Sequence, residues 1–412
     1  MIECDIEVPA EWPSSELARK ASGRTPYEYF EEFSPLFATT DVSFESIGPH
    51  MQEYLQQCGG STKSRRLLIG GMRGKHLLLA SPLVMWYLTH GLVVTKVYEA
   101  IEYTPKACFK PFTRQVTLER REGDAMLANV AKLIGNSSYG SLLIDKSKHS
   151  KIVYVSGRHD ACLKVNDPRF KSLTELDDDH YEVVMSKRRI KMDMPIQLGY
   201  FILQYAKLRM LQFYYDCIDR FCDRVDYEYL EMDTDSAYMG LSAPRLIDIV
   251  KPEMREEFLK QLENHCTDKS MDARDYWFPR TCCKKHAKFD NREPGLFKLE
   301  FSGDEMICLC SKTYVVSNAV ETKFSCKGIQ KRHVIDPLAI FNTVLNTRIT
   351  QSRTNIGFRS KDNKISTYTQ QRGGFSYFYI KRQVAADGIH TKPLDITLCP
   401  PVVTLCPSLI NS

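Results

Sequence analysis

The pattern of residues 229–239 constrains the fold more strongly than any other segment of this chain. Its sequence, YLEMDTDSAYM, has two apolar, strand-like halves on either side of a tight acidic turn. Two such runs joined by a short polar connection predict an antiparallel hairpin centred on Asp233. Side chains two positions apart lie on the same face of a strand. We therefore expect Asp233 and Asp235 to point the same way, with Glu231 behind them.

The carboxylates of this turn are candidate ligands for a cation. Converging carboxylates repel one another unless a cation lies between them. Hard oxygen ligands with few protein contacts suit Mg²⁺, which then bridges the oxygens of a phosphate. The alternative is an ordinary surface turn, since Asp and Ser favour turns in any case. A D-x-D sequence alone does not decide between the two.

A helix is predicted over residues 124–139. Apolar side chains recur at helical spacing and gather on one side of it, namely Met126, Leu127, Val130, Leu133 and Ile134. At about 100° per residue, Lys132, Asn136 and Tyr139 fall together on the opposite side. The ammonium of Lys132 can meet a phosphate, the ring of Tyr139 can stack or face a sugar, and the Asn136 amide can bond a base edge. This side of the helix therefore suits a nucleotide.

Three further residues could extend this nucleotide-binding face. Gly140 allows either close backbone approach or a C-terminal cap. Arg120 and Arg121 lie about three turns earlier and can offer planar donors to a triphosphate. The alternative is the solvent-exposed face of an ordinary amphipathic helix, because such faces are usually polar.

The N-terminal half of the chain shows no internal repeat and reads as mixed strand and helix. Residues 2–8 alternate as a strand that Pro9 ends, and residues 13–66 are predicted to be loop-rich and polar. Apolar runs in residues 67–97 predict strands around a helix at 82–90. A basic stretch at 106–121 leads into the helix described above, and strands joined by polar turns are expected within 145–194, for example at 151–155 and 181–185.

The C-terminal half begins with a long predicted helix at 195–222, with Pro195 in its first turn. After the acidic hairpin we expect a helical stretch through 247–264 and further strands over 296–316, one of them at 307–316. The pattern weakens after Lys331, and the end from Cys399 onward is expected to fray.

Bulk composition indicates a globular protein of more than one domain. The 412 residues carry 56 Lys and Arg against 51 Asp and Glu, an excess that permits a nucleic-acid partner without requiring one. Basic clusters that could line a groove are Lys63, Arg65 and Arg66; Lys187, Arg188, Arg189 and Lys191; and Lys284 and Lys285. The alternative for each cluster is a solvated face. No apolar run approaches the roughly 20 residues that span a bilayer, so no membrane partner is expected.

The cysteines point to a reducing compartment, the nucleus or the cytoplasm. The chain holds 14 cysteines, and residues 1–5 have neither the basic nor the apolar region of a secretory signal. One place is rich in Cys and His: His265, Cys266, Cys282, Cys283 and His286. Its spacing lacks the two-residue gap of zinc ribbons, so free thiols are preferred over a zinc site.

Three ordered motifs carry a resemblance to the family B DNA polymerases. KLIGNSSYG at residues 132–140 resembles the KxxxNSxYG motif of the fingers in that family. DTDS at 233–236 resembles the palm motif, and KTY at 312–314 resembles the KxY motif, with Lys312 and Tyr314 expected on one face of a strand. The long helix before the hairpin is most similar to the protein-primed branch found in viruses, linear plasmids and virus-like transposons.

The resemblance implies template-directed nucleotidyl transfer with two Mg²⁺ ions in DNA replication. It assigns metal binding to Asp235, with Asp233 in support, and the incoming triphosphate to Lys132, with Arg120 as a helper. Asn136 and Tyr139 would line the nascent base pair, Gly140 would belong to the same nucleotide-binding motif, and Lys312 and Tyr314 would grip the primer strand. The implied partners are a DNA primer–template, dNTPs and a terminal protein primer.

The chain departs from the family pattern in four ways. Residues 1–131 contain no DxxSLYP motif, whose Asp bridges both metals in the family, and the proofreading carboxylates are absent too. The two-metal site is therefore expected to be incomplete. Asp5 is a weak candidate substitute, because a metal site tolerates little displacement. Glu231 stands where many relatives have a tyrosine, and Ser141 where a lysine is common.

Three hypotheses follow from the motifs and the departures. The first is an N-terminally truncated C-terminal portion of a polymerase. The second is a catalytically inactive remnant that binds DNA or nucleotide without extension. The third is an unrelated metal-dependent phosphotransfer protein whose motif matches are accidental.

The resemblance implies an α+β fold in the right-hand polymerase layout, with an antiparallel palm sheet, helical fingers and a partial thumb. Residues 1–94 would form the start of the palm and an insertion, 95–145 the fingers, and 146–194 a second, β-rich insertion. Residues 195–330 would complete the palm with the DTDS hairpin, and 331–412 would form the thumb and C-terminal tail. Without the upstream strand the palm sheet would keep an unpaired edge, which favours aggregation.

Overall fold

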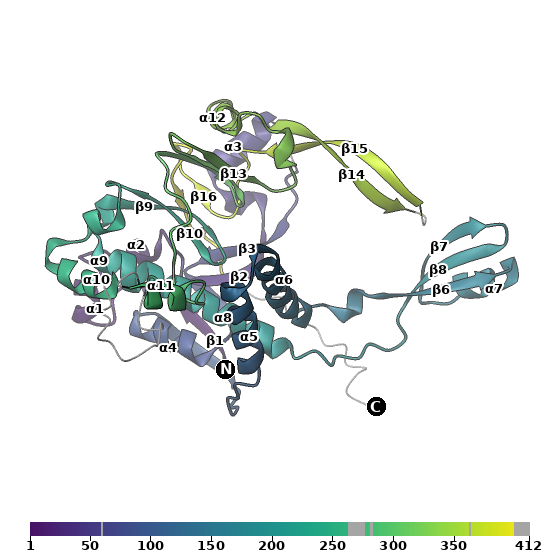
Figure 1. The fold of residues 1–412 in the computed structure, drawn as a ribbon, viewed down its shortest axis with the longest axis horizontal. Coiled ribbons are helices and arrows are strands. Elements are labelled where there is room, and N and C mark those ends of the chain that lie inside the picture. The colour runs from purple at the N-terminus through teal and green to yellow at the C-terminus, as the bar shows by residue number, and fades with distance from the viewer. Residues whose placement is uncertain (59–60, 263–276, 281–282, 362–363, 399–412) are drawn as a thin grey trace.

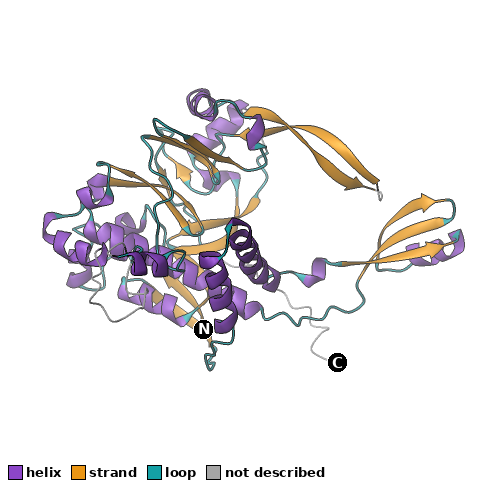
Figure 2. Cartoon of the chain, viewed as in Figure 1, coloured by secondary structure: helices purple, strands orange, loops and turns teal. Residues whose placement is uncertain are grey.

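The computed structural model describes residues 1–58, 61–262, 277–280, 283–361 and 364–398. Helices and antiparallel strands are mixed throughout, so the expected α+β class is confirmed (Figure 2). A larger body lies at the left of Figure 1, and two projections extend from it toward the right. One is a two-stranded ribbon formed by residues 351–361 and 364–375, and the other is a small unit formed by residues 150–186.

The opening strand β1 (Ile2–Glu7) is the centre of a three-stranded antiparallel sheet with the order β4-β1-β5. The other elements of this region are β4 (Arg73–Leu79), α4 (Ser81–Thr89) and β5 (Val93–Ala100). Cys4, Ile6 and Val8 are buried, as their alternation predicts. The strands expected around a helix in residues 67–97 are likewise confirmed.

The prediction that residues 13–66 are loop-rich is wrong. The stretch contains α1 (Ser15–Lys20), α2 (Pro26–Phe30), β2 (Leu36–Val42) and α3 (Pro49–Cys58), and β2 pairs with β3 (Arg65–Gly71). Ser14 caps α1, and Thr25 forms a capping box with Glu28 at the start of α2. Periodicity is read over windows of about 11–18 residues. These helices are shorter than that, so their caps were the better local signal.

Helix α6 (Ala125–Leu142) confirms the helix predicted over residues 124–139. Asp124 begins it, because its side chain accepts a hydrogen bond from Leu127 N at 2.8 Å. The basic stretch before it is itself a helix, α5 (Lys110–Glu122), which packs against α6. The helix continues past Gly140 and its C-cap is Leu143, so of the two roles considered for Gly140 the C-terminal cap is wrong.

The buried side of α6 is formed by small residues and not by its large apolar side chains. Ala128 and Ala131 are the buried positions. The five side chains that the periodicity grouped together are exposed: Met126, Leu127, Val130, Leu133 and Ile134. The distance between packed helices depends on the side chains at their contact, so alanines permit close approach.

Residues 150–186 form the small projecting unit at the right of Figure 1. It comprises β6 (Ser150–Ser156), α7 (Arg158–Val165), β7 (Phe170–Asp177) and β8 (His180–Ser186), with the strand order β6-β8-β7. Tyr181, Val183 and Met185 of the central strand are buried, as is Ala161 of α7. The strands expected at 151–155 and 181–185 are confirmed, whereas α7 was not anticipated.

The long helix predicted at 195–222 is present but is not uniform. It consists of α8 (Ile196–Gln212), a π-helical segment (Phe213–Ile218) and α9 (Asp219–Phe221). The π-helical turn is buried along most of its length, and its aromatic residues form part of the main core. The acidic hairpin follows as β9 (Tyr227–Asp233) and β10 (Ser236–Leu241), as predicted.

An aromatic cluster fixes the acidic hairpin to the body. The ring of Tyr229 on β9 lies 5.3 Å from that of Phe33 and 5.2 Å from that of Tyr214. Tyr229 N also donates to the Glu32 carboxylate at 2.6 Å, which satisfies an edge of this two-stranded sheet. Such aromatic contacts stabilise by about 0.5–1.5 kcal/mol each beyond burial alone. The turn at Asp233 is therefore presented from a well-packed base.

The predicted strand at 307–316 is a hairpin. It comprises β11 (Glu305–Cys310) and β12 (Thr313–Ser317), and β13 (Thr322–Cys326) completes a three-stranded sheet. Lys312 lies in the connecting turn with φ of 64°. The strands expected over 296–316 are confirmed only from Glu305 onward. Upstream, α10 (Arg255–Leu262) bears out part of the helical stretch expected at 247–264, and α11 (Lys284–Asp290) follows.

The C-terminal part is more ordered than its sequence pattern predicted. Helix α12 (Pro337–Thr347) leads into the ribbon of β14 (Gln351–Lys361) and β15 (Lys364–Phe375), which extends well beyond the body (Figure 1). The chain then returns through β16 (Gln383–Val384) and β17 (Thr391–Lys392). Leu398 forms a parallel bridge with Gly74, beside the N-terminal sheet. The fraying expected from Cys399 concerns residues outside the described part.

Candidate functional site

The acidic turn joins β9 to β10 through two residues. Asp233 pairs with Ser236 across the hairpin, and Thr234 and Asp235 form the turn. Thr234 has φ of 55°, a left-handed conformation that is unusual for a β-branched residue. Such strain persists where the surrounding structure enforces it, and it is common at functional sites. The turn thus presents two carboxylates on either side of a strained residue.

The β11–β12 turn brings Lys312 onto this acidic turn. Lys312 Nζ lies 2.8 Å from Asp233 Oδ1, and its side chain is 54% exposed. The hydrogen bond to Asp233 raises the pKa of the Lys312 ammonium, and the charges of Glu231 and Asp235 act in the same direction. The ammonium is therefore held in its charged form against the carboxylates.

A pair of tyrosines forms a second contact between the two hairpins. Tyr238 Oη donates to Tyr314 Oη at 2.7 Å, although the residues are 76 positions apart in sequence. Their ring centroids are 4.6 Å apart. Burial, together with this hydrogen bond, raises the pKa of Tyr238 above its ordinary range. Tyr314 and Lys312 thus face the DTDS hairpin from the same short segment.

Glu231 lies between the two hairpins. Its Oε1 accepts a hydrogen bond from Lys312 N at 2.7 Å. Burial raises the pKa of the Glu231 carboxyl, although the bond from Lys312 N acts against that change. Within the described residues Oε2 is buried and accepts no hydrogen bond, while the Cys308 thiol lies beside the carboxylate. Glu231 is therefore a half-buried acid on the same strand as Asp233, two positions before it.

Asp233 and Asp235 are the carboxylates at the turn that could hold a divalent cation. In the described part of the chain, no three His, Cys, Asp or Glu side chains converge closely enough to enclose a metal. Mg²⁺, however, is usually bound through one or two carboxylates, with waters and phosphate oxygens completing the shell. Asp233 and Asp235 can supply those oxygens, and among the described residues the buried Oε2 of Glu231 accepts no hydrogen bond. The Lys312 ammonium balances Asp233 in this structure.

The predicted nucleotide-binding residues lie on α6 and α5, separate in sequence from the acidic turn. Lys132 and Asn136 are exposed, and Tyr139 is half-buried, which raises its pKa. A Cβ at Gly140 would meet no atom within 4 Å, so no close protein contact demands glycine there. Among the described contacts, no hydrogen bond or ion pair links these residues to Asp233 or Asp235.

Arg120 and Arg121 differ in their surroundings. Arg121 forms an ion pair with Glu293 and donates to Asn291 O at 2.7 Å, so its guanidinium is engaged with the segment after α11. Arg120 is half-buried on the same helix. Arg120 therefore remains the candidate of the two for a triphosphate contact, as the motif assigns it.

Asp5 is engaged within its own sheet. Its carboxylate accepts hydrogen bonds from His76 N and Tyr98 Oη, both at 2.9 Å. These bonds lower the pKa of Asp5 even though partial desolvation opposes them. Asp5, His76 and Tyr98 belong to the β4-β1-β5 sheet, whereas Asp233 belongs to the separate β9–β10 sheet. The geometry gives no support to Asp5 as a substitute for the missing bridging aspartate.

The Cys/His-rich place falls partly outside the described residues. His265, Cys266 and Cys282 are not described by the structure. Cys283 is described and caps α11, accepting from His286 N at 3.5 Å, and His286 is buried.

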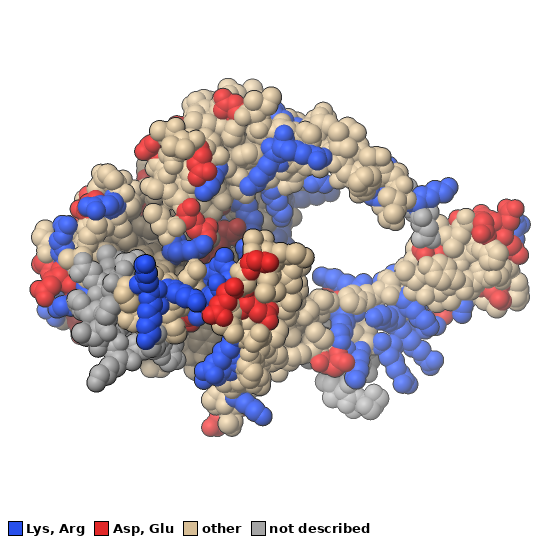
Figure 3. All heavy atoms as spheres, viewed as in Figure 1, with Lys and Arg blue, Asp and Glu red and all other residues tan. Residues whose placement is uncertain are grey.

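The basic surface on the two projections was largely missed by the sequence interpretation. Strands β14 and β15 contain several Lys and Arg and no Asp or Glu, and Arg359, Lys364 and Arg372 are exposed. Blue side chains border the opening between the ribbon and the lower arm in Figure 3. The lower arm is the projection that carries residues 150–186. The segment that follows this unit holds the exposed cluster Lys187, Arg188, Arg189 and Lys191, which the sequence analysis had identified. The lack of acidic residues over 351–375, apart from Asp362, was the available signal for the ribbon.

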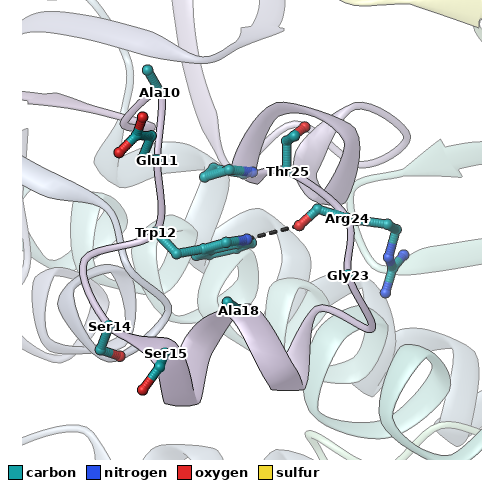
Figure 4. A pocket seen from close by; sticks show the side chains of 10 residues that line it. Ala10, Glu11, Trp12, Ser14, Ser15, Ala18, Gly23, Arg24 and Thr25 are labelled. Atoms are coloured by element: carbon teal, nitrogen blue, oxygen red, sulfur yellow. Dashed lines mark hydrogen bonds between the residues drawn. The ribbon is translucent and has the colours of Figure 1, made fainter.

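A hollow near the N-terminus is bordered by residues from the first two helices and the loop before them. Trp12 Nε1 donates to Arg24 O at 2.8 Å along its wall (Figure 4). The Arg24 guanidinium is paired with Asp219 at 2.9 Å. The polar groups of Trp12 and Arg24 are thus used in packing the core, and the hollow is not assigned a ligand.

The described helices include none that is both long and apolar enough to cross a membrane. Comparison of the chain with protein-family models, with curated proteins and with solved structures found no match, so the resemblance to family B polymerases rests on the three motifs.

Proposed function

We propose that this chain is the polymerising part of a DNA-directed DNA polymerase of the family B type. The observation that carries the proposal is the meeting of two motifs that the resemblance had matched independently. Lys312 of KTY lies on Asp233 of DTDS, and Tyr314 is bonded to Tyr238 three residues beyond that motif's Asp235. An accidental pair of short matches has no reason to meet in space.

In this proposal Lys312 and Tyr314 hold the end of a primer strand at the acidic turn. The ammonium supplies a point charge for a phosphate, and the ring supplies a surface for the sugar. Asp233 and Asp235 hold Mg²⁺ there, and when bound the ions would activate the primer hydroxyl and stabilise the charge on the leaving pyrophosphate. Lys132 and Arg120 receive the incoming triphosphate, with Asn136, Tyr139 and Gly140 at the nascent pair.

The right-hand layout belongs to the same proposal. The body with the β4-β1-β5 sheet and the two joined hairpins corresponds to the palm, and α5 with α6 corresponds to the fingers. The unit at residues 150–186 is the second insertion, and α12 with the ribbon β14–β15 is the thumb. Basic side chains on both projections would follow the phosphates of a duplex that lies between them (Figure 3).

The second candidate function is DNA binding without extension. It is favoured by Asp5, the candidate substitute for the bridging aspartate, because its carboxylate is committed to His76 and Tyr98. A two-metal clamp that lacks its bridging carboxylate loses a shared ligand. The DNA surface would be unchanged.

One experiment tests both candidates with a recessed-end DNA duplex. Fluorescence anisotropy should give an affinity that falls as salt rises, because Lys and Arg displace counterions from phosphate. Lys312→Met should weaken binding, whereas Lys323→Met on the neighbouring strand should not. Absent or salt-insensitive binding would overturn both candidates.

Primer extension with the same duplex separates the two candidates. Metal-dependent extension that is lost in Asp235→Asn and retained in Asp304→Asn supports the polymerase. Binding with no extension by the wild-type chain supports the second candidate.

A further inference from the structure

The ammonium of Lys312 occupies the carboxylate that a divalent cation would need. Lys312 Nζ is 2.8 Å from Asp233 Oδ1, within direct ion-pair distance. A cation that binds Asp233 through the same oxygen must displace this ammonium or share the carboxylate with it. Like charges repel strongly at such separations, so simultaneous close binding is unfavourable.

Only the side chain of Lys312 is free to move away. Its backbone N–H is held by Glu231 Oε1 at 2.7 Å, and the next residue, Thr313, is 2% exposed. The Lys312 side chain, by contrast, is 54% exposed and has four rotatable methylenes. The ammonium can therefore swing into solvent, or onto a phosphate, while the turn keeps its place.

We infer that Lys312 is an exchangeable counter-ion of Asp233, and that binding of a DNA phosphate by Lys312 frees Asp233 for a divalent cation. The inference rests on the proposed DNA-binding function. Coupling between two ligands is reciprocal, so the cation should strengthen DNA binding by the same factor by which DNA strengthens cation binding. Glu231 acts as a positioning residue, because it fixes the turn from which Lys312 reaches both partners.

The first arm of the test needs no DNA. Binding of Mn²⁺, used as a paramagnetic probe for Mg²⁺, is measured by electron paramagnetic resonance on the full chain. Lys312→Met should bind Mn²⁺ more tightly than wild type, by about 5- to 150-fold, the usual range of coupling between sites. Lys323 lies on β13, and its Nζ is 3.2 Å from Glu321 Oε1. Lys323→Met should leave the Mn²⁺ affinity unchanged. Asp233→Asn should abolish the tight site.

Equal Mn²⁺ affinity in wild type and Lys312→Met would overturn the inference, as would the absence of any Mn²⁺ site sensitive to Asp233→Asn. Lys312→Gln serves as a second variant and should show the same direction as Lys312→Met. Circular dichroism of each variant establishes that it is folded. This arm fails or succeeds independently of whether the chain binds DNA.

The second arm adds a saturating recessed-end duplex. DNA should tighten Mn²⁺ binding to wild type but not to Lys312→Met, in which no ammonium remains to be displaced. If DNA binds and leaves the wild-type Mn²⁺ affinity unchanged, the exchange is wrong while the DNA-binding function stands. If DNA does not bind at all, the proposed function fails, and a tighter Mn²⁺ site in Lys312→Met would still show the competition at Asp233.

Discussion

The backbone N–H of Lys312 donates a hydrogen bond to Glu231 Oε1 across 2.7 Å and ties the β11–β12 turn to strand β9. Lys312 has φ of 64°, a conformation that residues other than Gly, Asn and Asp seldom adopt. The bond to Glu231 helps to hold that conformation. Glu231 thus has a structural role that the motif resemblance did not assign to it.

Glu231→Ala should lower the free energy of unfolding by about 1 kcal/mol, the usual net value of one hydrogen bond. The bond is partly exposed, so water can replace the lost acceptor and keep the loss small. Glu231→Gln retains an acceptor oxygen and should cost less than Glu231→Ala. Urea denaturation measures both. An equal loss in Glu231→Gln and Glu231→Ala would contradict a hydrogen-bonding role and point to the carboxylate charge, which both changes remove.

The periodicity and turn residues of a segment predicted those helices and strands that depend only on residues close together in the sequence. The DTDS hairpin and the helix α6 follow from residues that are close in sequence, and both were placed within a few positions. The contact between Lys312 and Asp233 spans two hairpins, so periodicity could not reveal it. In the sequence, only the resemblance of the three motifs to one family predicted that Lys312 and Asp233 belong to the same site.

The failures of the sequence interpretation also have physical causes. The turn at Lys312 lacks Gly, Asn and Pro, the residues that usually mark a break in a strand, so residues 307–316 read as continuous. The buried side chains of α6 are alanines. Larger apolar residues on another face of the helix dominate its hydrophobic periodicity, so the periodicity indicated the wrong face as buried. The ribbon β14–β15 is largely exposed on both faces, so it carries little alternation.

The ribbon should contribute to DNA binding through charge alone. Replacing Arg359 and Lys364 by Gln removes two exposed cations from β14 and β15. If both contact phosphates, the slope of log K against log salt should become shallower by about 2, since each phosphate contact contributes about 0.9. The slope is measured by anisotropy between low and moderate salt.

The matched control for the ribbon is the double change Lys20→Gln and Lys260→Gln, which removes two exposed lysines from α1 and α10. Its salt slope should equal that of wild type. An equal reduction of the salt slope in both double variants would mean that net charge, and not the ribbon, governs DNA binding.

Lys207 should make stability depend on pH in the neutral-to-basic range. Its ammonium lies 5.1 Å from the Phe37 ring and 5.6 Å from the Tyr87 ring, and burial lowers the pKa of Lys207 to about 7. In the unfolded chain a lysine titrates near about 10.4. Between these values the unfolded state binds more protons, so stability should rise with pH. Thermal melts between pH 7 and 9 measure this rise.

Lys207→Met keeps an apolar chain of similar length and removes the buried charge. Its melting temperature at pH 7 should exceed that of wild type, and its rise between pH 7 and 9 should be smaller. The exposed lysine change Lys20→Met should alter neither quantity. A lower melting temperature for Lys207→Met at pH 7 would show that the ring contacts outweigh the cost of burying the charge.

The Arg280–Asp290 pair should be the most sensitive electrostatic element of the body. Both side chains are 0% exposed, and Arg280 Nε lies 2.8 Å from Asp290 Oδ2. Burial alone would raise the pKa of Asp290, but the hydrogen bonds from Arg280 outweigh it and leave that pKa lowered. Asp290→Asn removes the carboxylate charge from this buried ion pair, and breaking a buried pair typically costs about 3–5 kcal/mol. Asp304→Asn, at an exposed carboxylate, should cost little.

Acid melts test the same pair through linkage. A carboxyl with a lowered folded pKa stabilises the protein above its unfolded pKa of about 3.9, and this contribution is lost as pH falls through the folded value. The difference in melting temperature between wild type and Asp290→Asn should therefore be full at pH 6 and should shrink below about pH 4. The difference between wild type and Asp304→Asn should stay small throughout. A wild-type advantage over Asp290→Asn that persists unchanged to pH 2.5 would mean that packing around residue 290, and not its ion pair, carries the stability.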